Sequence, residues 1–68
     1  MKKFCENHQC DCGMQFEWKT FFLQSGESWF GRWDEAKKNV IDQDIINKQY
    51  HITIRCPKCN RRFFIVKE

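Results

Sequence analysis

The chain has 68 residues, of which 41% are hydrophobic and 31% charged, and its formal net charge is +3. This composition is too apolar for a disordered tail, and the length suits one small domain over residues 1–68. Ordering the chain costs roughly 1.5 kcal/mol per residue, about what so small a core returns, so we expect a cross-link. The first ten residues contain no apolar run of signal-peptide or membrane-span length, so we expect a cytoplasmic protein without a membrane partner.

The number and spacing of the cysteines indicate which kind of cross-link to expect. The chain has five cysteines, an odd number, which in a reducing compartment favours metal ligation over a disulfide framework. A thioredoxin-like redox pair begins a helix, whereas Cys56 and Cys59 stand between two strand-like runs. The cysteines therefore predict a metal site.

Two short segments combine close cysteines with a turn residue and a phenylalanine. Residues 10–16 read CDCGMQF, and residues 56–63 read CPKCNRRF. Gly13 and Asn60 follow the last cysteine of each segment, and these residue types most readily adopt the left-handed conformation that ends a tight turn. The paired pattern resembles the two knuckles of the zinc ribbon family, but the first knuckle, residues 10–13, is Cys-x-Cys where Cys-x-x-Cys is commoner.

Zinc binds four ligands in a tetrahedron, and two knuckles supply four thiolates. The favoured ligands are Cys10, Cys12, Cys56 and Cys59. Cys5 and His8 have a Cys-x-x-His spacing and are alternatives, mainly through His8 replacing one cysteine of the first knuckle. Otherwise we expect Cys5 to be a small buried residue or a free thiol, and His8 to be a solvated loop residue. Four thiolates leave no position for water, so we predict one structural Zn²⁺.

Hydrophobic periodicity places three kinds of element between and beside the knuckles. Alternating side chains predict a half-buried strand over residues 14–23, followed by a turn around Gly26. Asp34 is a suitable N-cap, and apolar residues recur after it at helical spacing, which predicts a helix over about residues 34–48. Alternation in YHITIR and the apolar run FFIV predict a zinc-knuckle hairpin over residues 50–67.

We expect FFIV to form a central strand, because it is apolar on both faces, and the strand over residues 14–23 to complete a three-stranded antiparallel sheet. The predicted fold class is a small α+β zinc ribbon with two knuckles and one inserted helix packed on the sheet. The chain lacks a serine with a plausible base, a phosphate-cradling glycine loop and a His-Glu-x-x-His motif. We therefore expect a binding module rather than an enzyme, without a small-molecule substrate.

Charge favours nucleic acid as the partner. Residues 50–68 have a net charge of +4, whereas residues 1–49 have a net charge of −1. The basic residues of the C-terminal segment are Arg55, Lys58, Arg61, Arg62 and Lys67. Phe64, Tyr50 or a tryptophan of WFGRW could stack on bases. A Zn²⁺ ion with four thiolates lowers the formal net charge from +3 to about +1, so binding to phosphates is expected to be weak and salt-sensitive.

The stretch ITIRCPKC also resembles the second zinc knuckle of the Com-type phage regulators, small proteins that bind messenger RNA. This resemblance implies binding to RNA. For a small protein with a metal cross-link and no enzyme motif, we expect a regulator that contacts nucleic acid or the transcription and translation machinery, and the size of the chain suggests a phage or bacterial origin. The alternative is an inhibitor or adaptor that binds another protein. Its candidate contact residues, of types enriched in binding hot spots, are Trp29, Phe30, Arg32 and Trp33. Those rings could instead cover the open end of the sheet and hold the start of the helix.

Overall fold

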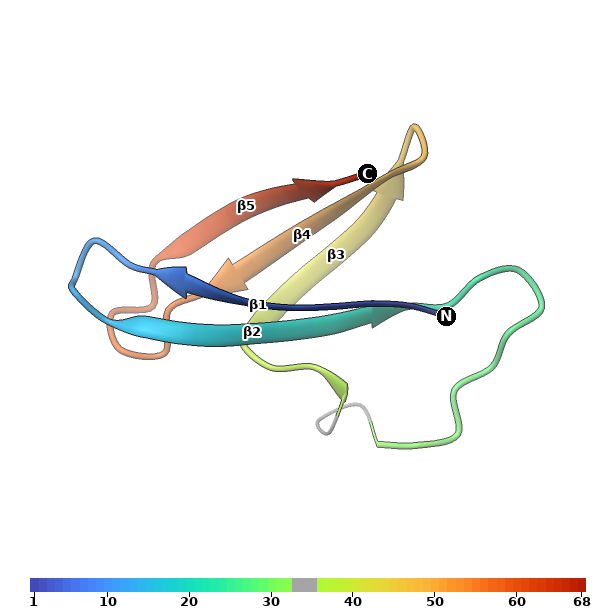
Figure 1. The fold of residues 1–68 in the computed structure, drawn as a ribbon, viewed down its shortest axis with the longest axis horizontal. Coiled ribbons are helices and arrows are strands. Elements are labelled where there is room, and N and C mark those ends of the chain that lie inside the picture. Colours follow the sequence, from blue (N-terminus) through green and yellow to red (C-terminus); the bar gives the residue numbers. More distant parts are fainter. Residues whose placement is uncertain (33–35) are drawn as a thin grey trace.

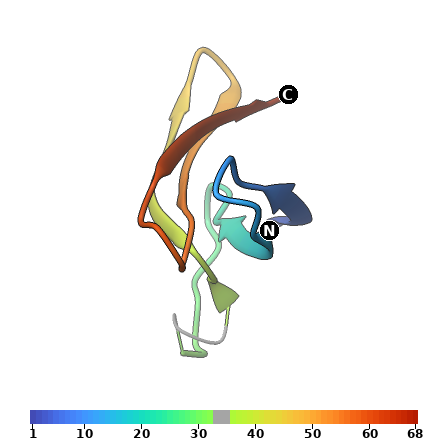
Figure 2. The ribbon, with the colours of Figure 1, turned by 90° about the vertical axis from the view of Figure 1, so that its left-hand side faces the viewer.

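The computed structural model describes residues 1–32 and 36–68 and contains two antiparallel sheets. The strands are β1 (Lys2–Gln9), β2 (Gln15–Phe22), β3 (Val40–Ile46), β4 (Gln49–Arg55) and β5 (Arg62–Lys67). β1 pairs with β2, and the other three strands form the order β3-β4-β5 (Figure 1). The β1-β2 sheet lies against one face of the larger sheet, so the fold has two layers (Figure 2).

The core fills the space between the two sheets. Alternation along β2 turns Phe16 and Trp18 inward, and alternation along β4 turns Ile52 and Ile54 inward to meet them. All four side chains are buried, and full burial of a side chain of this kind contributes about 1.5 to 3 kcal/mol. The same cluster includes Cys10 and Cys56, so the core extends to the end of the molecule where the cysteine turns lie.

β1 supplies a second set of contacts with the larger sheet. The Phe4 ring packs edge-on against Tyr50 of β4, at a centroid distance of 5.3 Å, and also against Phe22 of the neighbouring β2, at 6.0 Å. Two residues further on, Glu6 forms an ion pair with Lys67 of β5. No strand was predicted for residues 2–9, because this segment has few apolar residues and its alternation is therefore weak.

The helix predicted over residues 34–48 is wrong over its described part, where β3 occupies Val40–Ile46 and pairs with β4. The predicted N-cap at Asp34 lies outside the described residues. Asn47 and Lys48 explain the difference, because their φ angles of 51° and 65° form the two-residue turn that joins twisted antiparallel strands. The segment before this turn is rich in β-branched residues, which favour strands.

The larger sheet also differs from the predicted one in its members. β2 lies within the segment where a strand was expected, but it pairs with β1 and not with β4. β4 is the central strand, and β5, which includes FFIV, is at the edge. The prediction of a central strand was wrong because one face of the FFIV segment is open to solvent. Phe64, on that face, is 84% exposed.

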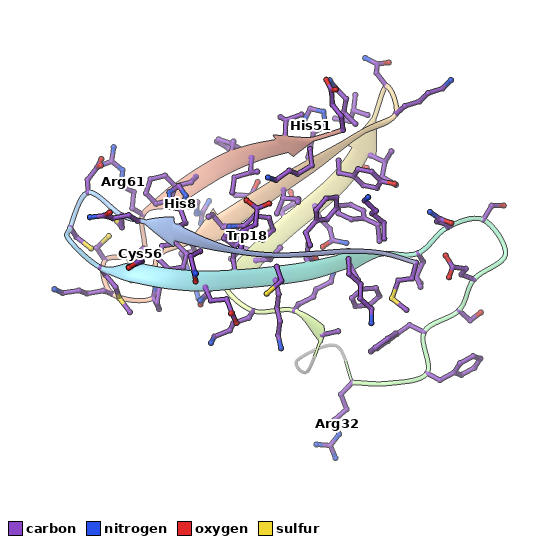
Figure 3. All side chains as sticks on the ribbon, viewed as in Figure 1. His8, Trp18, Arg32, His51, Cys56 and Arg61 are labelled. Carbon is purple, nitrogen blue, oxygen red and sulfur yellow. The ribbon has the colours of Figure 1, made fainter. Side chains whose placement is uncertain are left out.

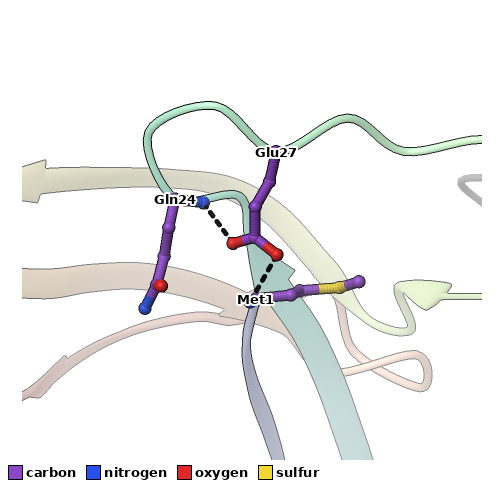
Figure 4. Close-up of polar contacts among 3 residues, drawn as sticks. All are labelled: Met1, Gln24 and Glu27. Atoms are coloured by element: carbon purple, nitrogen blue, oxygen red, sulfur yellow. Dashed lines mark hydrogen bonds and ion pairs between the residues drawn. The ribbon is translucent and has the colours of Figure 1, made fainter.

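The chain between β2 and β3 is tied back to the two-stranded sheet. Gly26, with φ 84°, allows the tight turn in which Glu27 N donates to Gln24 O over 3.0 Å. The Glu27 carboxylate accepts from the Met1 amino group at 2.7 Å and from Gln24 N at 2.9 Å (Figure 4). The amino group and then the Gln24 N–H lower the pKa of Glu27. Before β3, Lys38 and Lys19 exchange two backbone hydrogen bonds.

Replacing Lys48 by glycine tests the β3-β4 turn. At a φ of 65° a side chain with a Cβ is strained, so Lys48→Gly is expected to raise the free energy of unfolding by about 0.5 to 1 kcal/mol. Lys48→Ala keeps the Cβ and should give no such gain. Urea denaturation measures the free energy of unfolding of both variants. In a helix, glycine would instead lower the free energy of unfolding by about 1 kcal/mol. Such a decrease in the Lys48→Gly variant would contradict the hairpin.

Candidate metal centre

The first cysteine turn connects β1 to β2. Cys10 N donates to Met14 O over 2.8 Å, and Gly13 N donates to Cys10 O over 3.0 Å. Gly13 has φ 95°, which confirms the left-handed conformation predicted for it. These bonds hold the Cys-x-Cys segment in a closed loop that begins where β1 ends.

The second cysteine turn connects β4 to β5 and has the same frame with one more residue. Cys56 N donates to Arg61 O and Asn60 N donates to Cys56 O, each over 2.9 Å. Asn60 has φ 63° and takes the place of Gly13, as predicted. The two cysteine turns therefore have the same pattern of backbone hydrogen bonds to the first cysteine, and the second turn is one residue longer.

The two turns bring four sulfur atoms together at one end of the core, and these atoms lie within 4.8 Å of one another. Each short distance joins one turn to the other: Cys10 Sγ to Cys59 Sγ is 3.4 Å, and Cys12 Sγ to Cys56 Sγ is 3.7 Å. Both exceed the disulfide bond length of about 2.05 Å, and the cysteines are unbridged. A tetrahedral ion with metal–sulfur bonds of about 2.3 Å has sulfur–sulfur edges of about 3.8 Å, so the cluster could hold one metal ion.

The sulfurs differ in environment. The Cys12 N–H lowers the pKa of the Cys10 thiol, but burial and the neighbouring thiols outweigh it and raise that pKa to about 12. Burial raises the pKa of Cys56, but the N–H groups of Cys59 and Lys58 and the neighbouring thiols bring it down to about 7. A divalent metal among the four sulfurs would favour the ionised form of the thiols that bind it.

An ion pair also joins the two turns. Arg61 Nη1 lies 2.7 Å from Asp11 Oδ2, and both side chains are exposed, so the pair contributes at most about 1 kcal/mol. The Arg61 guanidinium lies 5.8 Å from the centre of the Phe63 ring. This partner of Arg61 was not predicted, although Asp11 lies between the two cysteines of the first turn.

Cys5 and His8, the alternative ligands, are not part of the four-sulfur group found among the described residues. Cys5 is an exposed free thiol in the middle of β1. His8 lies in β1 and is half-buried, with its ring 4.4 Å from that of Phe63 and 5.7 Å from that of Phe16. The expectation of a solvated loop histidine is therefore wrong: His8 packs beside the cysteine turns (Figure 3).

The five basic candidates do not form one surface. Arg61 is paired with Asp11, and Lys67 is paired with Glu6 across the two sheets. Lys58 is exposed within the second turn. Arg55 and Arg62 are cross-strand partners at the end of β4 and β5, and both are exposed.

The aromatic candidates for protein binding are also divided. Trp29 is half-buried and packs on Phe21 with a centroid distance of 4.6 Å, so it covers the outer side of β2. Phe30 is 95% exposed, and Arg32 is exposed far from the cysteine turns (Figure 3). Trp33 lies outside the described residues.

Comparisons with known proteins found no match among family models, curated proteins or solved structures. In the part of the chain that the structure describes, no helix has the length and apolar character needed to cross a membrane. The four-sulfur group is the central feature of the site.

Serine substitutions separate the ligand sets. Cys56→Ser removes a buried sulfur from the centre and is expected to abolish stoichiometric metal binding and folding. Cys5→Ser is the matched control and should keep full metal content, because Cys5 is exposed and outside the centre. Native mass spectrometry and circular dichroism measure both effects. Metal loss in Cys5→Ser but not in Cys10→Ser would show that the first turn is wrongly assigned.

Proposed function

We propose that the four cysteines hold one structural Zn²⁺ ion, as in a zinc ribbon. The support is the sulfur geometry: four thiol donors within 4.8 Å of one another, two from each turn. Tetrahedral sites made of four sulfurs suit zinc or iron, and zinc is the usual ion where such a site staples a small fold. Four protein ligands fill the tetrahedron and leave no position for water, so the ion would stabilise the fold and would not catalyse a reaction.

Removing the ion tests this role. The sulfurs of Cys12 and Cys56 are separated by 44 positions in the chain, and closing a loop of that length is worth about 4 kcal/mol by analogy with a disulfide. We expect native mass spectrometry to find one zinc per chain, and chelation to abolish the near-ultraviolet circular dichroism of the buried tryptophan. A metal-free chain that keeps this signal would contradict the proposal, as would iron with its visible absorption.

We infer that the stapled domain is a non-enzymatic regulator that binds nucleic acid. The observation that carries this inference is the exposed basic group around the second turn, formed by Arg55, Lys58 and Arg62. Three unneutralised cations on one short segment can contact phosphates, which dominate nucleic-acid affinity. Because the zinc centre brings the net charge close to neutral, binding should be local to this group and sensitive to salt.

Binding to a protein is the second candidate function, and a specific observation favours it. The loop that follows β2 exposes Phe30 almost fully, and Arg32 lies two residues further on. Phenylalanine and arginine are both enriched in protein–protein interfaces relative to the rest of the surface. Trp29 adds little to this surface, because it packs on Phe21.

A pulldown from cell lysate, with and without nuclease, separates the two functions. Under the nucleic-acid proposal, captured material should be lost after nuclease digestion and should decrease steeply as salt is raised. Under the protein alternative, a partner should persist after digestion and be lost in Phe30→Ala with Arg32→Ala. A nuclease-resistant partner, together with no binding of purified RNA or DNA at low salt, would overturn the nucleic-acid proposal.

A further inference from the structure

The larger sheet has a second face that the β1-β2 sheet does not cover (Figure 2). Because Ile52 and Ile54 of β4 point into the core, the alternate residues Thr53 and Arg55 point outward. Their partners in the β4-β5 register are Phe64 and Arg62, so these four side chains share the outer face. We call this group the outer patch.

Two arginines of the outer patch lie directly opposite each other. Arg55 and Arg62 are Cα partners at the end of β4 and β5, and like charges in that position destabilise a sheet. Both are exposed, and neither forms an ion pair or a side-chain hydrogen bond within residues 1–32 and 36–68. A bound anion would relieve this repulsion, and the arginine fork matches a phosphate group.

An aromatic ring lies beside the arginine pair. Phe64 is two residues beyond Arg62 on the same face of β5, about 6.6 Å along the strand, and is 84% exposed. Phe64 and Arg62 line one hollow together with Thr53, Asp42 and Ile41. A flat ring next to a phosphate-sized positive site is the combination that single-stranded nucleic acid uses, with a base on the ring and its phosphate on the cations.

We propose that an unpaired nucleotide strand binds the outer patch, with a phosphate on Arg55 and Arg62 and a base stacked on Phe64. This inference rests on the proposed nucleic-acid function. It adds that the nucleic acid is single-stranded and that it binds the outer patch. The bases of a duplex are already stacked on their neighbours, so only an unpaired base can lie on Phe64.

Acidic residues limit where the strand can run. Asp42 and Asp44 belong to β3, and their register partners in β4 are Thr53 and His51 of the outer face. Their carboxylates repel phosphates, so the sugar–phosphate backbone should stay on the β4-β5 side near the second cysteine turn. The hollow brings only Asp42 close to Phe64, where its carboxylate can accept a hydrogen bond from an exocyclic amino group of the stacked base.

The chain offers matched controls for each part of the patch. Phe30 and Phe64 are both exposed phenylalanines, at 95% and 84%, so Phe30→Ala controls for Phe64→Ala. Arg32 and Arg62 are both exposed arginines, so Arg32→Glu controls for Arg62→Glu. All four side chains lie outside the core, so the variants should keep their zinc and their circular dichroism spectrum, which are checked first.

The experiment measures fluorescence anisotropy of a short labelled single-stranded RNA of mixed sequence, and of the same RNA in a duplex, with zinc-loaded protein. We expect the single strand to bind at least tenfold more tightly than the duplex. Phe64→Ala should weaken single-strand binding about tenfold. Arg62→Glu should weaken binding and reduce the logarithmic salt slope by about 0.7. Phe30→Ala and Arg32→Glu should leave the affinity within twofold.

The outcomes that would overturn this inference are distinguishable from one another. RNA binding that is salt-dependent but unchanged in Phe64→Ala and Arg62→Glu, or equally tight for the duplex, would refute the outer patch and leave the nucleic-acid function standing. Failure of the folded, zinc-loaded protein to bind either RNA, or the corresponding DNA, at low salt would refute both. Loss of binding in the Phe30 control equal to that in Phe64→Ala would also refute the assignment to this face.

Discussion

The convergence of four cysteine sulfurs at one end of the core is the constraint on which the rest of the structure depends. A two-stranded hairpin is marginally stable alone, and the β1-β2 sheet is such a hairpin. It is held against the larger sheet by the core and, at one end, by the sulfur pairs Cys10–Cys59 and Cys12–Cys56. Because each pair takes one sulfur from each turn, a metal there would join the two sheets and not merely close one loop.

The sheets are joined away from the cysteines by polar contacts of a different kind. Gln43 of β3 points inward, where its amide donates to Phe21 O over 2.8 Å and its carbonyl accepts from the buried Thr20 hydroxyl. Lys19 and Lys38 add two backbone hydrogen bonds beside this contact. These bonds satisfy polar groups that burial between two sheets would otherwise leave unpaired, at a cost of about 1 to 3 kcal/mol each. They fix the position of β3, while the sulfur cluster fixes the first and second turns.

The parts of the structure that the sequence predicts are those set by local chemistry. Gly13 and Asn60 identify the two cysteine turns because a left-handed residue is needed at each, and both have positive φ. β3 was mistaken for a helix because Val40, Ile41 and Ile45 satisfy helical spacing as well as strand pairing, and its turn contains no glycine. What decides between them is pairing with β4, a tertiary contact that spacing does not reveal. The partners of Arg61 and Lys67 depend on the same tertiary arrangement.

The cysteine turn between β4 and β5 links the metal centre to the outer face of the larger sheet. Cys56 follows Arg55 directly, and its N–H donates to Arg61 O, so the turn that positions a buried sulfur also sets the register in which Arg55 faces Arg62. The two arginines are exposed on the face of the larger sheet opposite the core. Loss of the metal would therefore remove the frame that holds this pair together, before any residue that contacts a ligand is changed. Under the two proposals made above, the affinity of the outer face for a nucleotide strand would therefore depend on the occupancy of the metal centre, through the turn between β4 and β5.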